Sequence, residues 1–128
     1  MKKLIFLFAI IISFSSCKKS TEANTLLGSW RVDSYKENGN DNTTIFLSTY
    51  TDYQIKFDAS NNFIETYKLA GINVTKAGDW KMTNGGSDYE LTNQADSTKR
   101  YFHIIELNPA SASVSENSGN KEYHYLKN

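Results

Sequence analysis

Short apolar runs with a period of two, separated by turn-forming residues, constrain the fold of this chain most. In the clearest run, residues 53–58 read YQIKFD, so that three large apolar side chains alternate with polar ones. Successive side chains of a strand point to opposite faces, and the alternation therefore predicts a β-strand with one buried face. Turn formers at 58–62 and a second run at 63–69 predict its hairpin partner.

Runs of the same kind recur to the end of the chain. Residues 84–87 read NGGS and predict a tight hairpin turn, because Asn and Gly tolerate positive φ. Residues 100–107 are apolar on both faces, which predicts a central strand that is covered on both sides. About eight strands are expected, at residues 28–35, 53–57, 63–69, 75–83, 88–92, 100–107, 112–114 and 122–127.

Strands joined mostly by hairpins predict an all-β fold. A small antiparallel up-and-down barrel is favoured because closure removes both exposed sheet edges, and an open sandwich is the alternative. The long segment at 36–52, between the first two strands, begins as an Asn/Gly/Asp-rich loop. Its residues 43–50 (TTIFLSTY) fit a short helix or an extended flap over one barrel end, where their apolar side chains would be covered.

The N-terminus has the layout of a secretory signal. Lys2 and Lys3 precede an apolar segment at 4–12, and small polar residues lead to Cys17. The apolar segment is too short for a membrane-spanning helix, which needs about 20 residues. We therefore expect residues 1–16 to be a signal peptide, 17–25 a flexible tether and 26–128 one folded domain.

Cys17, the single cysteine, follows Ser15 and Ser16 and resembles the lipobox of bacterial lipoproteins. The resemblance implies cleavage before Cys17, diacylation of its sulfur and anchoring to a membrane. Lys18 in place of Asp implies sorting to the outer membrane. Surface export in lipoproteins of Bacteroidota tends to follow an acidic run after the cysteine, which is absent here, so the periplasmic face is favoured over the cell surface.

Charge excludes some partner classes. The chain holds 14 basic and 14 acidic residues, and the part from Cys17 onward, without Lys2 and Lys3, carries a formal charge of −2. Basic residues form no patch in the sequence, so a nucleic-acid partner is not expected.

Three motifs, in this order, resemble the lipocalin-like lipoprotein domains of Bacteroidota. They are residues 26–30 (LLGSW), the hairpin residues 57–63 (FDASNNF) and residues 78–82 (GDWKM) before a glycine turn. The resemblance implies a lipocalin-like barrel. It also implies that Trp30 closes one barrel end, with a basic side chain packed across it, for which Lys127 is the candidate near the C-terminus.

Polar side chains on the predicted strands nominate a binding surface. Glu65 shares the face of Phe63, Tyr67 and Leu69, and enters the barrel if that face points inward. The opposite phase, with Ile64 and Thr66 inward, is nearly as compatible with the pattern. An inward carboxylate needs a partner such as Arg31, a tyrosine hydroxyl or a ligand. The residues nominated for ligand binding are Glu65, Tyr67, Tyr101, His103, Tyr123 and Tyr125.

Signatures of catalysis are absent from the sequence. It has no nucleophile elbow and no phosphate loop, and His103 and His124 lie on predicted strands that are not neighbours, so neither an enzyme, a metal site nor a cofactor is expected. Two functions remain. The barrel carries a small apolar or amphipathic ligand near the outer membrane, or it is filled by its own side chains and serves as an accessory protein that contacts another envelope protein.

Overall fold

A computed structural model describes residues 15–116 and 119–128, with side chains from Thr21 onward. The helical elements of this part are α1 (Ser15–Leu26), α2 (Thr43–Thr49) and the 3₁₀ turn η1 (Asn84–Gly86). The strands are β1 (Gly28–Glu37), β2 (Asn40–Asp41), β3 (Thr51–Phe57), β4 (Asn62–Leu69), β5 (Ile72–Thr83), β6 (Asp88–Asn93), β7 (Lys99–Leu107), β8 (Ser111–Glu116) and β9 (Lys121–Lys127).

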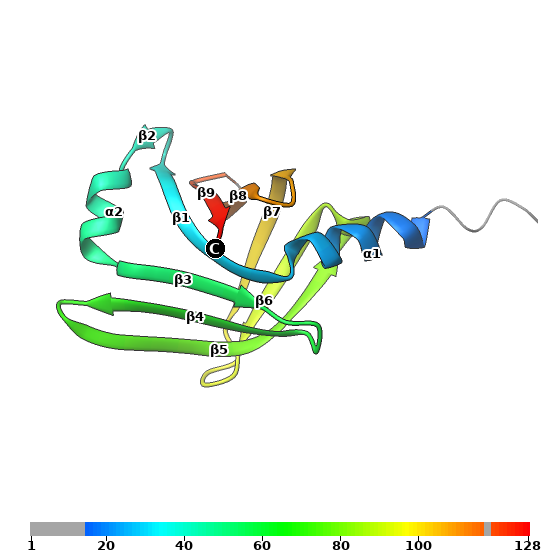
Figure 1. The fold of residues 1–128 in the computed structure, drawn as a ribbon, viewed down its shortest axis with the longest axis horizontal. Helices are drawn as coiled ribbons and strands as arrows, with labels where there is room; N and C mark the ends of the chain where they lie inside the picture. Colours follow the sequence, from blue (N-terminus) through cyan, green and yellow to red (C-terminus); the bar gives the residue numbers. More distant parts are fainter. Residues whose placement is uncertain (1–14, 117–118) are drawn as a thin grey trace, which may run out of the picture.

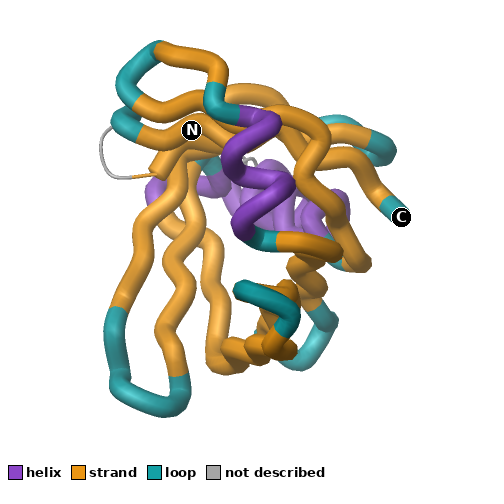
Figure 2. The backbone as a smooth tube through the Cα atoms, turned by 90° about the vertical axis from the view of Figure 1, so that its left-hand side faces the viewer, coloured by secondary structure: helices purple, strands orange, loops and turns teal. Residues whose placement is uncertain are grey.

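The sheet closes on itself. From β3 to β9 each strand pairs antiparallel with the next, β3 also pairs with β1, and β9 returns to pair with β1. The closing register runs from Trp30 opposite Lys127 to Glu37 opposite Lys121. Eight strands therefore form the barrel seen in Figure 2, and the two-residue β2 adds a short flap beside β1. The prediction of a closed antiparallel barrel is confirmed, and the open-sandwich alternative is wrong.

Period-two alternation fills the barrel interior. In β3, every second residue from Tyr53 to Phe57 is buried and the residues between them are exposed, as the sequence pattern predicts. Burying one such large apolar side chain stabilises the fold by about 1.5–3 kcal/mol. The buried strand residues of the core are Trp30, Val32, Tyr35, Tyr53, Ile55, Phe57, Phe63, Trp80, Met82, Tyr89, Leu91, Phe102, Ala112, Val114, Tyr123 and Tyr125.

Strand β7 corrects one expectation. The sequence predicts that residues 100–107 are covered on both sides, but the outward side chains of Tyr101 and Ile105 are 59% and 54% exposed. The barrel is a single layer of sheet, and in the described part of the chain no second layer covers this outer face. The prediction of a doubly covered strand is therefore wrong.

The segment before the barrel is a helix rather than the predicted flexible tether. The end of α1 is held by Leu26, which is buried, and by two side chains that bind its terminal carbonyls. Trp30 Nε1 donates to Leu26 O at 2.8 Å, and Lys127 Nζ donates to Thr25 O at 3.2 Å. Carbonyls at a helix C-terminus lack partners inside the helix, so these bonds fix α1 against the barrel.

The second helix, α2, covers the other end of the barrel, as Figure 1 shows. The short helix is one of the two forms that the sequence predicts for residues 43–50. Its start is anchored because Thr43 Oγ1 donates to Asp41 Oδ1 at 2.7 Å and accepts the Tyr35 backbone N–H at 3.0 Å. Helices in the described part of the chain are too short or too polar to cross a bilayer.

Gly78 marks a close approach of β5 to β6. A Cβ built on it would lie 1.8 Å from the backbone oxygen of Thr92 on β6. We predict that Gly78→Ala destabilises the barrel by about 3 kcal/mol or more, because two backbones must separate. Gly39→Ala is the control. A Cβ there meets no atom within 4 Å, so the loss of unfolding free energy is limited to the cost of a positive φ (78°), about 1–2 kcal/mol. Equal losses of unfolding free energy in urea titrations would contradict the close approach.

Candidate functional site

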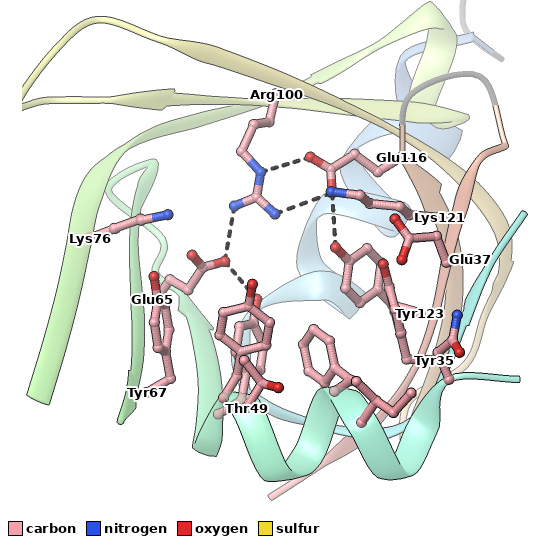
Figure 3. A pocket seen from close by; sticks show the side chains of 15 residues that line it. Tyr35, Glu37, Thr49, Glu65, Tyr67, Lys76, Arg100, Glu116, Lys121 and Tyr123 are labelled. Atoms are coloured by element: carbon pink, nitrogen blue, oxygen red, sulfur yellow. Dashed lines mark hydrogen bonds and ion pairs between the residues drawn. The ribbon is translucent and has the colours of Figure 1, made fainter. Parts of the chain in front are cut away.

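A cavity of about 500 Å³ lies between α2 and the barrel interior. Figure 3 shows side chains from β1, α2, β3, β4, β5, β7, β8 and β9 converging on it. Segment 43–50 therefore covers the mouth of an interior space rather than a filled barrel. The lining residues are Tyr35, Glu37, Asn42, Ile45, Phe46, Thr49, Tyr50, Tyr53, Glu65, Tyr67, Lys76, Arg100, Glu116, Lys121 and Tyr123.

An ion-pair network forms the inner wall of the cavity. Arg100 donates from Nε and Nη2 to the two oxygens of Glu116, at 2.8 and 3.3 Å, and from Nη1 to Glu65 Oε2 at 3.0 Å. The three residues come from β7, β8 and β4, so closure of the barrel brings them together. The forked guanidinium suits this role because it can bind one carboxylate at two points and still reach another.

Two tyrosine hydroxyls complete the network. Tyr53 donates to Glu65 Oε2 at 2.6 Å, and Tyr123 donates to Glu116 Oε2 at 3.0 Å. Burial raises the pKa of both phenols, and the neighbouring carboxylates raise it further. The hydroxyls therefore stay protonated at neutral pH and act as donors to the carboxylates.

The network is charged at neutral pH. Burial disfavours ionisation of Glu116, but the hydrogen bond and the positive charge of Arg100 outweigh it and lower the pKa of this carboxyl. Burial likewise opposes the charge of Arg100, while its bonds to Glu116 and the charge of Glu65 raise the pKa of the guanidinium. One guanidinium between two carboxylates gives the network a formal charge of −1.

Aromatic rings form a second wall of the cavity. Phe46, the buried residue of α2, has its ring centroid 4.7 Å from that of Tyr35 and 4.9 Å from that of Tyr50. The centroids of Tyr53 and Tyr67 lie 6.1 Å apart with nearly parallel planes. Burial and the nearby Glu37 raise the pKa of Tyr35 to about 12. The cavity thus combines apolar ring faces with a charged inner end, the usual make-up of a small-molecule site.

The nominated binding residues separate into two groups. Glu65, Tyr67 and Tyr123 line the cavity. Of the two phases considered for residues 63–69, the observed one therefore turns Glu65 inward and Ile64 outward. Tyr125 is buried deeper, stacked on Tyr123 with centroids 5.7 Å apart, and does not line the cavity.

Tyr101 and His103 face outward and do not line this cavity, and their nomination for ligand binding stays a prediction. They flank buried Phe102 on β7, and alternation along the strand turns them to the outer surface. His103 Nδ1 lies there 2.6 Å from Asp88 Oδ1. The second histidine, His124, also faces outward, with Nδ1 3.3 Å from Asp33 Oδ2.

Sequence reasoning missed Arg100, Glu116 and Tyr53. It suggested Arg31 as a partner for an inward Glu65, but Arg31 is exposed on the outer face of β1. The alternation along β7 could have pointed to Arg100, because Arg100 lies two residues before Phe102 and shares its inward face. Glu116 likewise shares the face of Ala112 and Val114 on β8.

Trp30 and Lys127 lie at the opposite end of the barrel from the cavity. Lys127 Nζ is 4.8 Å from the centroid of the Trp30 indole, and both side chains bind carbonyls of α1. The pair thus joins the helix to the closed end of the barrel, and it has no part in the cavity.

The depressed pKa of Glu116 predicts a pH-dependent contribution to stability. Ionised Glu116 stabilises the fold fully above the ordinary glutamate pKa of about 4.3, and this stability is lost as the pH falls through the lower pKa of the folded state. We predict that Glu116→Gln lowers the free energy of unfolding by about 1.5–3 kcal/mol at pH 7, because its bonds to Arg100 are weaker, and that this loss shrinks between about pH 5 and pH 3. Urea titrations across this range measure it. A cost that stays constant with pH, as expected for the exposed control Glu106→Gln, would contradict the assignment.

A comparison with protein families agrees with this architecture. A family model described as a lipocalin-like domain matches residues 26–111, which run from the end of α1 to the start of β8. A search of curated proteins gave no match. The lipocalin-like fold is generally a ligand-binding fold, in keeping with the cavity. Because the match covers more than half of its length, the chain belongs to the lipocalin-like domain family.

Proposed function

We propose that this protein binds a small amphipathic molecule in the cavity beneath α2. The observation that carries the proposal is the cavity itself, a space of about 500 Å³ within the range of small-molecule sites. A barrel filled by its own side chains, the accessory-protein alternative, would leave no such space.

The lining supports an amphipathic ligand. Ring faces of Phe46, Tyr50 and Tyr67 suit an apolar body, whereas the network around Arg100 suits a polar end. We propose no catalytic role for the network. Glu65 and Glu116 each accept bonds from Arg100 and from a tyrosine, so neither is poised as a general base.

Protein extracted from its own envelope should carry the ligand. We predict that native mass spectrometry shows a noncovalent mass increment that disappears on denaturation. Tyr67→Ala should lower the loaded fraction several-fold because it removes part of the cavity wall. Tyr101→Ala, which removes an outward-facing ring, is the matched control and should leave the fraction unchanged. Bare protein in repeated preparations of the unchanged chain would refute the proposal.

We further propose that Cys17 is acylated and anchors the protein to the outer membrane, with the periplasmic face favoured. Several acyl chains suffice for stable anchoring, since each buried CH₂ contributes about 0.8 kcal/mol. Cys17 lies in the sequence of α1, which packs on the end of the barrel away from α2 (Figure 1). An anchor at this position is compatible with a cavity mouth that faces away from the membrane.

The anchor has its own test. We predict that Cys17→Ser moves the protein from the membrane fraction to the soluble fraction and abolishes the mass of the acyl chains. Ser20→Ala, a small change three residues further on, should leave both unchanged. The anchoring proposal would be overturned if the Cys17→Ser protein stayed in the membrane fraction and the unchanged chain carried no acyl mass. The ligand-binding proposal would be unaffected by that result.

A further inference from the structure

The inner wall of the cavity holds a carboxylate oxygen that receives no hydrogen bond from the described part of the protein and remains open to the cavity. Glu65 is 2% exposed, and its Oε2 accepts hydrogen bonds from Tyr53 and Arg100. Within residues 21–116 and 119–128, no side chain or backbone N–H donates to its Oε1. In Figure 3 the two bonds of Glu65 converge on one oxygen, and the other oxygen lies on the far side from the guanidinium.

Charge within the cavity is arranged in two layers. The inner layer is the network of Glu65, Arg100 and Glu116, with a formal charge of −1. The outer layer holds Lys76, Lys121 and Glu37, with a formal charge of +1, and Lys76 lies directly opposite Glu65 in the pairing of β4 with β5. The buried negative charge acts in a lower dielectric than the more exposed lysines, so it has the stronger effect on a group that reaches the inner wall.

An anionic ligand end fits the inner wall poorly. Nε, Nη1 and Nη2 of Arg100 each already donate to a carboxylate. A guanidinium has five N–H groups, so two remain. An anion that reached them would lie beside both Glu65 and Glu116, and like charges in a partly buried site repel strongly.

A cationic end fits it well. A protonated amine at Glu65 Oε1 would supply the donor that this oxygen lacks and neutralise the surplus charge of the network. The electron-rich faces of Tyr53 and Tyr67 line the same part of the cavity and attract a cation. Lys76, which also lines the cavity, shows the same affinity, since its Nζ lies 5.8 Å from the centroid of the Tyr67 ring.

We propose that the cavity selects amphipathic ligands whose inner end is a protonated amine, held by Glu65 Oε1 and the surrounding tyrosines, and that it discriminates against carboxylates. This inference rests on the proposed ligand-binding function and defines its ligand class. Glu65 is the residue that determines the specificity, and Arg100 is a positioning residue that holds the carboxylate in place.

Three probes with the same aromatic body separate charge from shape. Naphthylmethylamine, naphthylmethanol and naphthylacetate are titrated by calorimetry at pH 7 into the full chain in a nonionic detergent, with detergent buffer as the blank. We expect the amine to bind at least about tenfold more tightly than the acid, with the alcohol between them, as one unit charge near a partly buried carboxylate requires.

Three substitutions assign the preference to its source. Glu65→Gln keeps the shape and the acceptor for Tyr53 while removing the charge, and should reduce the preference for the amine about tenfold. Lys76→Gln removes a competing cation from the cavity lining and should increase the preference. Glu106→Gln makes the same change of charge on the outer surface of β7 and should change nothing.

The outcomes separate this inference from the function on which it rests. Saturable binding of the three probes without a preference for the amine, or with a preference for the acid, would overturn the inference and leave ligand binding standing. Saturable binding of none of them would overturn both. If Glu65→Gln fails to fold, two results still decide the question: the order of affinities of the three probes for the unchanged chain, and the expected increase of the preference for the amine in Lys76→Gln.

Discussion

The pairing of β1 with β9 is the constraint on which the rest of the structure depends. It joins the two ends of the sheet, from Trp30 opposite Lys127 to Glu37 opposite Lys121, and leaves the barrel without a long free edge. The same pairing sets the two ends of the barrel apart. At one end Trp30 and Lys127 bind the carbonyls of α1, and at the other Tyr35 and Tyr123 face the cavity beneath α2.

Closure also explains how a chain of this size holds a charged network in its interior. Glu65, Arg100 and Glu116 come from three strands, and each lies at an inward position next to large apolar residues. A buried carboxylate without a partner would cost several kcal/mol, so the network is stable because each member binds another. The arrangement leaves one oxygen of Glu65 turned away from these bonds and one negative charge in excess. An interior built for stability alone gains nothing from either feature.

Much of the fold could be predicted from the sequence because alternation is a local signal. The hairpin of β3 and β4 and the closed barrel followed from short apolar runs and their turns, and the short helix at 43–49 was one of two forms considered. The outward face of β7 was misjudged because Tyr101 and Ile105 are large and apolar, yet solvent faces them. Helix α1 was misjudged because its C-terminal end is held by contacts with Trp30, on the first strand, and with Lys127, 102 residues beyond Thr25.

Less of the candidate site could be predicted, for the same physical reason. Glu65, Tyr67 and Tyr123 were nominated from their strand positions, but the alternation around Glu65 fits either phase until its partner is known. That partner, Arg100, lies 35 residues further along the chain, and the separation is bridged by three antiparallel pairings. Side-chain partners of this kind are set by closure and register, which single runs of sequence do not encode.

The central claim is that the space beneath α2 holds a small molecule in the native protein. A crystal structure of the full chain purified from its own envelope tests it most directly. The account predicts continuous density between Phe46 and Arg100, with an end that contacts Glu65 Oε1. Separate water peaks in that space, or a Phe46 side chain that fills it, would contradict the claim.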